Sequence, residues 1–226
     1  DRIRGHLPAI SRVIRRHLLE GRIGQIVPLE PLQQRRRHQR RLHMIGRQML
    51  RQPGVDVAVL EAARGGLLRR GLGVQKADAA LITNISEDHL GDFGSHTVPE
   101  LLDVKWIISR SVRDEGRLIL NADDARLVAK AETYPGEIIW FSIERDSPGG
   151  LPGRSTALFA LDADDLVVLV DGAATAFANV RDIALTMQGI ARHNVANALA
   201  ASALIWCLGA SLADIGKGLR SMSQDD

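Results

Sequence analysis

The chain has 226 residues, of which 45% are hydrophobic and 25% are charged, so it can bury the core of one large domain or of one and a half small ones. Its single cysteine, Cys207, excludes a disulfide framework and a cysteine-based metal site. No apolar run approaches the roughly 20 residues of a membrane helix, and the first residues lack the apolar core of a signal peptide, so we expect a cytoplasmic protein without a membrane partner.

The net charge of +2 conceals an uneven distribution along the chain. Residues 1–50 hold 12 arginines, no lysine and 3 acidic residues, a net +9, whereas residues 51–226 carry a net −7. The segment 33–41 is rich in Arg, Gln and His and has no hydrophobic periodicity. It is interpreted either as a basic arm that neutralises nucleic-acid phosphates or as an out-of-frame translation of a GC-rich gene. The second interpretation is favoured, so nucleic acid is not expected as a partner.

A domain boundary is predicted near Pro53, which separates an irregular basic segment, 1–52, from an α/β domain, 53–226. Near-continuous apolar runs predict strands buried on both faces. Apolar residues with helical spacing predict helices between them. The predicted strands are 55–61, 79–83, 118–120 and 137–143, and the predicted helices are 99–112 and 123–132. This alternation favours a mostly parallel sheet flanked by helices.

The pattern changes after a Gly- and Pro-rich loop at 147–153. Short strands separated by Asp and Gly turns predict a small antiparallel sheet packed on the parallel one. These strands are 158–161, 166–170 and 174–180. Two helices are predicted to follow, 193–208 and 212–221, and Ser211 is expected to cap the second of them.

Polar side chains follow the first two predicted strands. Glu61 ends the first strand, and His89 lies shortly after the second, in the run SEDHL. Ligands of open parallel sheets bind beyond the carboxyl ends of the strands, so both residues are expected at one rim. A carboxylate and an imidazole suit a divalent cation. The alternatives are a solvated carboxylate at a strand end and a hydrogen-bonded structural histidine.

Four motifs occur in the order VLEAARGGLLRRGLG, LITNISEDHLG, LILNADD and ARHNVANALAA. Together they resemble the Mur ligase family, and within it the Mur-ligase half of the cyanophycin synthetase type, over residues 55–222. The resemblance implies the family's central, ATP-binding domain. Such enzymes join a carboxylic acid to an amine at the expense of ATP, by way of an acyl phosphate.

The resemblance also implies roles for single residues. Glu61 would hold Mg²⁺ beside the terminal phosphates of ATP, and His89 would contribute to a second metal site. Lys105 would be carbamylated by CO₂, which converts an ammonium into an anion that can hold Mg²⁺. The alternative for Lys105 is an ordinary surface lysine whose stem covers apolar neighbours.

Three further residues are expected to contact the nucleotide. Asn194 and Asn197 share one helix face, and their amides match the donor and acceptor edge of adenine. Asp123, in the NADD motif, would contact the nucleotide or the water shell of the metal. Helix capping is the alternative for Asp123 or Asp124 and for Asn194.

The substrates implied are an amino acid and a small-molecule or acidic peptide acid. Arg64, Arg69 and Arg70 could bind the acidic peptide or lie on the surface as ordinary arginines.

The phosphate-binding loop of the family, of the type G-T-N-G-K-T/S-T, has no counterpart in the sequence. No lysine precedes Lys76. The third, C-terminal domain of the family is not recognised either. We therefore expect an incomplete or inactive copy of an ATP-dependent ligase. The competing hypothesis is a non-catalytic protein that binds nucleotides or nucleic acids through its arginine-rich segment.

Overall fold

The computed structural model describes residues 55, 57–62, 67–68, 72, 76–85, 97–144 and 149–222. The chain divides into two compact units, residues 1–75 and 76–226. The boundary predicted near Pro53 stays a prediction, and His89, Arg64, Arg69 and Arg70 lie outside the described residues.

In the first unit, the described residues do not form the strand predicted over residues 55–61. Val55 and residues 57–62 have no regular secondary structure, and most of their side chains are exposed, with Val59 at 64%. An apolar run becomes a buried strand only when a neighbouring strand pairs with its backbone and helices cover it. The described residues of this unit form no such ladder, so the prediction from hydrophobicity alone is wrong here.

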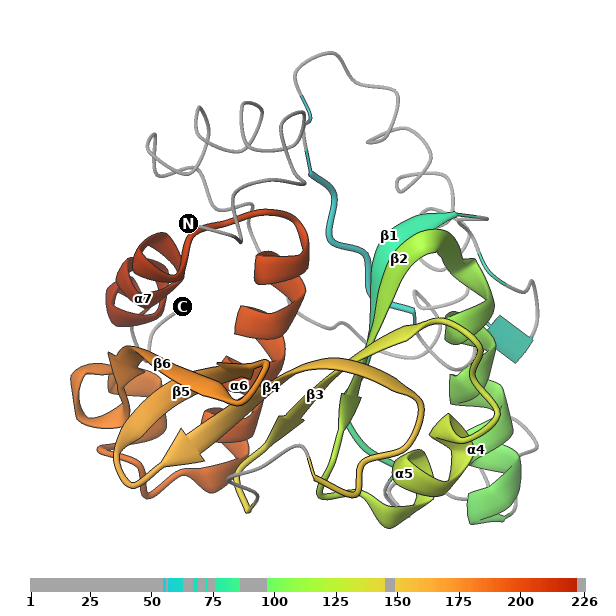
Figure 1. Ribbon diagram of the computed structural model, residues 1–226, viewed down its shortest axis with the longest axis horizontal. Coiled ribbons are helices and arrows are strands. Elements are labelled where there is room, and N and C mark those ends of the chain that lie inside the picture. Colours follow the sequence, from blue (N-terminus) through green and yellow to red (C-terminus); the bar gives the residue numbers. More distant parts are fainter. Residues whose placement is uncertain are drawn as a thin grey trace, which may run out of the picture. The chain divides into compact units, whose positions relative to one another are not determined.

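The second unit is built on one six-stranded mixed sheet (Figure 1). Its strands are β1 (Ala77–Ile82), β2 (Val112–Asn121), β3 (Glu137–Ser142), β4 (Arg154–Asp162), β5 (Asp165–Val170) and β6 (Ala173–Asn179). β1 to β4 are parallel, and β4, β5 and β6 are antiparallel. The predicted α/β class is confirmed, but the antiparallel strands extend the parallel sheet instead of packing on it. The reason is that β4 pairs along both of its edges.

Helices connect and cover the strands. They are α4 (Val98–Trp106), α5 (Ala125–Ala131), α6 (Arg192–Cys207) and α7 (Leu212–Ser221). α4 begins with a capping box, in which Thr97 accepts from the backbone N–H of Glu100 and the Glu100 carboxylate accepts from that of Thr97. The helix predicted over 99–112 is shorter than expected, because a 3₁₀ segment follows at residues 107–111 and β2 already begins at Val112.

The sheet is buried on both faces, and its strands therefore alternate between two cores. Leu118 and Trp140 pack on the side that contains Leu127 of α5. Ile119 and Phe141 pack on the opposite side, with residues of α6 and α7. α6 runs across β1 to β4 and covers one face of them, which explains why the buried parts of these strands are apolar (Figure 1).

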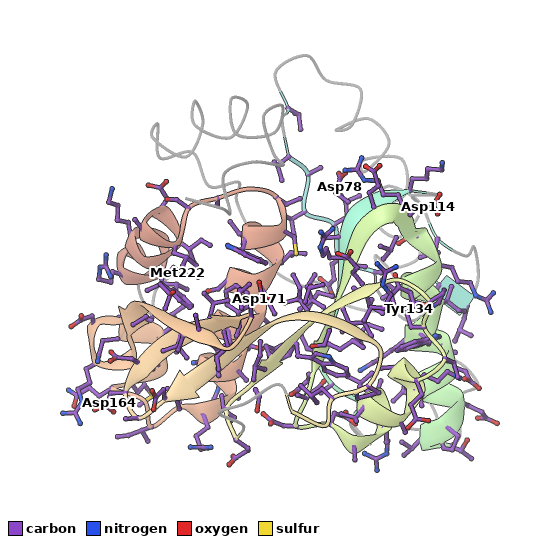
Figure 2. All side chains as sticks on the ribbon, viewed as in Figure 1. Asp78, Asp114, Tyr134, Asp164, Asp171 and Met222 are labelled. Carbon is purple, nitrogen blue, oxygen red and sulfur yellow. The ribbon has the colours of Figure 1, made fainter. Side chains whose placement is uncertain are left out.

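Charged residues lie at the amino ends of the same strands. Arg117, Glu137 and Arg154 are register partners on β2, β3 and β4, and ion pairs join Glu137 to Arg117 at 2.8 Å and to Arg154 at 3.6 Å. Asp78 of β1 forms an ion pair with Arg113 of β2 at 2.8 Å, and Figure 2 labels Asp78 and Asp114 on these two neighbouring strands. Within the described ranges, no helix is long and apolar enough to cross a membrane.

α7 is fixed by its cap and by close packing. The Ser211 hydroxyl accepts from the backbone N–H of Asp214 at 3.1 Å, as predicted for the N-cap. Gly216 lies against the backbone of β6, and a Cβ atom there would overlap the carbonyl oxygen of Phe177. A Cβ atom at Gly218, half a turn away, would meet no atom within 4 Å.

This difference predicts opposite effects for the same substitution at two positions of one helix. Gly216→Ala should lower the free energy of unfolding by about 1–3 kcal/mol, because α7 must move away from β6. Gly218→Ala, the matched control, should raise it by up to about 1 kcal/mol through higher helix propensity. Urea denaturation measures both, and equal effects of the two variants would contradict the close packing.

Candidate active site at the carboxyl edge of the sheet

Polar segments follow the carboxyl ends of β1, β2 and β3, where an open parallel sheet binds its ligands. They are residues 83–85, 121–124 and 142–144. Because the three strands are neighbours in the sheet, these segments lie beside each other. We call this region the carboxyl edge.

The segment after β1 is held by side chains from two helices. Lys105 Nζ of α4 donates to the carbonyl oxygen of Asn84 at 2.8 Å. The backbone N–H of Ile85 donates to Asp124 Oδ2 at 2.7 Å, and Arg126 Nη1 donates to the carbonyl oxygen of Ile85 at 3.3 Å. The Ile85 side chain is only 2% exposed, so the chain is fixed as it leaves β1.

The consecutive aspartates after β2 have different partners. Asp124 is the N-cap of α5, and its Oδ1 accepts from the backbone N–H groups of Arg126 at 3.0 Å and Leu127 at 3.4 Å. Asp123 is not the cap. Its carboxylate accepts from the Ser142 hydroxyl and, at 2.8 Å, from the backbone N–H of Ile143. Asp124 therefore joins the end of β2 to β1, and Asp123 joins it to β3.

The carboxyl edge continues to the start of α6. Arg192, the first residue of that helix, forms an ion pair with Glu144 at the end of β3 and donates to the carbonyl oxygen of Ile143 at 3.4 Å. The N-cap of α6 is Ala191, so the capping alternative for Asn194 is wrong. Asn194 instead donates through Nδ2 to the carbonyl oxygen of Leu185 at 2.7 Å.

Asn197 lies one turn after Asn194 on α6, and its side chain is exposed. No hydrogen bond to its amide is found in the described part of the chain, so both the donor and the acceptor of this amide face solvent. The turn before α6 contains three residues with positive φ, Met187, Gln188 and Gly189. Ile190, which follows them, is 79% exposed. An apolar side chain and a polar amide are thus available near the start of one helix.

An open hollow of about 440 Å³ lies beside α5. Carboxylates of Asp123, Glu132 and Glu144 line it, together with small apolar residues. Three acidic side chains would repel a phosphate group that has no cation beside it.

The predicted site residues are only partly brought together. Lys105 and Asp123 lie at the carboxyl edge, each one bonded to the end of a neighbouring strand. Glu61 is exposed in the first unit, and His89 lies outside the described residues. The described residues contain no group of three His, Cys, Asp or Glu side chains that could hold a metal ion. The ligand roles of Glu61 and His89 stay predictions.

The side chains of Arg126 and Glu144 contact the carboxyl edge or belong to it, and neither was predicted from the sequence. Arg126 lies two positions after the NADD motif, in the first turn of α5. A residue at such a position can reach back to the end of a neighbouring strand. Glu144 lies two residues after the end of β3, and the rule that placed Glu61 at the end of a strand could have indicated it.

Comparisons with known proteins agree with this architecture. The Mur ligase middle domain model matches residues 34–205. The chain is 36% identical over 177 residues to a cyanophycin synthetase of Geminocystis herdmanii, a match that covers 77% of this chain and 20% of that protein. It is 31% identical over 175 residues to a UDP-N-acetylmuramoylalanine–D-glutamate ligase of Chlorobium phaeobacteroides, covering 73% of this chain and 34% of the other.

Among solved structures, MurF from Acinetobacter baumannii is 23% identical, with a TM-score of 0.47, and the match covers 71% of this chain and 31% of that one. The chain spans about a fifth of the length of the cyanophycin synthetases that it matches. The family match extends over most of its residues and includes β1, β2, β3 and the first part of α6. The chain belongs to the Mur ligase middle domain family.

Proposed function

We propose that the chain is the nucleotide-binding part of an ATP-dependent ligase that joins an acid to an amino acid, of the cyanophycin synthetase type. The observation that carries this proposal is the carboxyl edge, where Lys105 of α4 reaches the segment that follows β1. The names of the relatives, cyanophycin synthetase and UDP-N-acetylmuramoylalanine–D-glutamate ligase, support the ligase class.

Lys105 is proposed to act as a carbamate. Its neutral amine would add to CO₂, a new N–C bond would form, and a proton would leave to solvent. The product keeps one N–H, which can still donate to the carbonyl oxygen of Asn84, and it gains a carboxylate. An ammonium at this position would repel Mg²⁺, whereas a carbamate can hold it.

Asn194 and Asn197 are proposed to bind the adenine base. The side-chain amide of Asn197 is exposed. The Nδ2 of Asn194 donates to the carbonyl oxygen of Leu185, and its amide oxygen is the group proposed to accept from adenine. A side-chain amide offers the donor and acceptor pair that the edge of adenine requires. Asp123 is proposed to contact the nucleotide or the water shell of the metal from the end of β2, with its carboxylate oriented by Ser142 and Ile143.

ATP and Mg²⁺ are the cofactors of this proposal. Mg²⁺ would spread the negative charge of the phosphates, and Glu61 and His89 are the residues proposed to hold it. The substrates would be an amino acid and a small-molecule or acidic peptide acid, and a cytoplasmic location remains the expectation from composition.

The competing proposal, a non-catalytic nucleic-acid-binding protein, is motivated by the net +9 of residues 1–50. Fluorescence anisotropy with labelled duplex DNA at two salt concentrations separates the two. The ligase proposal expects weak binding that high salt abolishes. Tight binding that survives physiological salt would favour the competing proposal.

The adenine contact leads to a testable prediction. Asn197→Ala should weaken the binding of Mg-ATP by roughly threefold to tenfold, because a hydrogen-bonded amide contributes about 0.5–1.5 kcal/mol net. Isothermal titration calorimetry measures this, with Asn179→Ala as the control, since the Asn179 amide is already engaged, donating to Asp165 and accepting from the backbone N–H of Arg181. Unchanged affinity in Asn197→Ala would remove this residue from the proposed site.

A second prediction concerns turnover. The 226-residue chain should bind ATP without forming an amide bond, since no lysine before Lys76 can neutralise the γ-phosphate. The loss of one such preorganised group costs about 10²–10³ in rate, and the glycine-rich loop is missing with it. Phosphate release should stay at the background rate when an amino acid and an acidic peptide are added. Release well above background would show that other residues supply the missing charge.

A further inference from the structure

We propose that Asp124 is a positioning residue that acts on Lys105 through a single peptide group, the one between Asn84 and Ile85. The relevance of this role to catalysis rests on the proposed function. The hydrogen bonds that define the role, and the experiment that tests it, do not depend on that function. Nothing in the family comparison assigns Asp124 a role.

The peptide group is held on both sides. Its carbonyl oxygen belongs to Asn84 and accepts from Lys105 Nζ at 2.8 Å, and its N–H belongs to Ile85 and donates to Asp124 Oδ2 at 2.7 Å. A carboxylate, an amide and an ammonium thus form a chain of charge-assisted hydrogen bonds. Each bond polarises the amide in the direction that strengthens the other.

Asp124 cannot turn away from this peptide without a cost to α5. Its second oxygen, Oδ1, caps the helix by accepting from the backbone N–H groups of Arg126 and Leu127. The helix itself is anchored, because the Leu127 side chain is fully buried. The same carboxylate therefore serves as the cap of α5 and as the acceptor for Ile85.

Two further contacts keep the peptide in place. Arg126 Nη1 donates to the next carbonyl oxygen, that of Ile85, at 3.3 Å, and the Ile85 side chain is buried in the core that α4 and α5 share. The direction of the Asn84 carbonyl is thus set by the first turn of α5. Lysine has a flexible stem of four carbons, so a fixed acceptor restricts the positions that Nζ can take.

The test separates the two tasks of Asp124. Asp124→Ser keeps a good N-cap, but the serine side chain is too short and has only one oxygen, so it cannot also reach Ile85. Asp124→Ala removes both contacts. Ser211→Ala is the matched control, because it removes the N-cap of α7 and leaves Lys105 untouched.

The readout is trace acetylation of the lysines with acetic anhydride, quantified by mass spectrometry. Lys105 is compared with Lys76, an exposed lysine at the start of β1. In Asp124→Ser the relative labelling of Lys105 should rise by about fivefold, as expected when a hydrogen bond that restrains the amine is lost. The melting temperature of this variant should stay close to that of the unaltered chain, and Ser211→Ala should leave the labelling ratio unchanged.

The proposal is overturned if Asp124→Ser leaves the labelling ratio of Lys105 unchanged while the protein stays folded. It is also overturned if Ser211→Ala raises that ratio as much as Asp124→Ser does. If the Asp124→Ala variant unfolds, the labelling of Lys130 and Lys217 rises together with that of Lys105. In that case the labelling ratio of Lys105 in Asp124→Ser decides whether Asp124 positions Lys105.

A ¹³C spectrum in labelled bicarbonate tests the carbamate separately. A carbamate signal that weakens in Asp124→Ser supports the positioning role. If the unaltered chain gives no signal, the carbamate part of the proposed function fails, and the labelling ratio still decides the role of Asp124.

Discussion

Two carboxylates next to each other in the chain hold the carboxyl edge of this sheet together. Asp123 accepts from Ser142 and Ile143 at the end of β3, and Asp124 accepts from Ile85 beyond β1. Because both residues follow β2, the central strand of the three, each neighbour is tied to it by one aspartate. Asp124 also caps α5, so the helix and the strand ends are fixed by the same few atoms.

The remaining polar contacts extend this arrangement to both sides. Lys105 of α4 binds the Asn84 carbonyl, and Arg192 of α6 binds Glu144. The helices on the two faces of the sheet thus meet its carboxyl edge through charged side chains, while their apolar residues fill the two cores. A binding site built in this way stands on rigid elements, which is what a reaction that depends on positioning requires.

The sequence predicted those helices and strands whose formation depends mainly on their own residues. The apolar runs indicated β3, β5 and β6 to within one residue at each end, and Ser211 indicated the start of α7. Features that depend on distant partners were not predicted correctly. Residues 55–61 have the composition of a strand but no ladder among the described residues. The short strands after residue 153 joined the main sheet because β4 pairs with β3 along one edge and with β5 along the other.

The candidate site shows the same limit. The motif NADD indicated a polar strand end, but the choice of cap between its two aspartates depends on which backbone N–H groups lie nearby. The sequence allowed Asn194 to be the cap of α6, but the helix begins at Arg192. The side-chain amide of Asn194 donates instead to the carbonyl oxygen of Leu185. Arg126 became visible only through its contact with Ile85, 41 positions earlier in the chain.

Amide hydrogen exchange at Ile85 and Ile143 tests the central claim most directly, because each of these N–H groups donates to one of the two aspartates. The two amides lie just beyond strand ends, where exchange is usually fast. If Asp123 and Asp124 hold the carboxyl edge together, both amides should be protected nearly as well as that of Ile119 in the centre of β2. When one aspartate is replaced by alanine, protection should fall, of these two amides, at the one that donates to it. Exchange of both amides at the rate of an open loop in the unaltered chain would contradict the account.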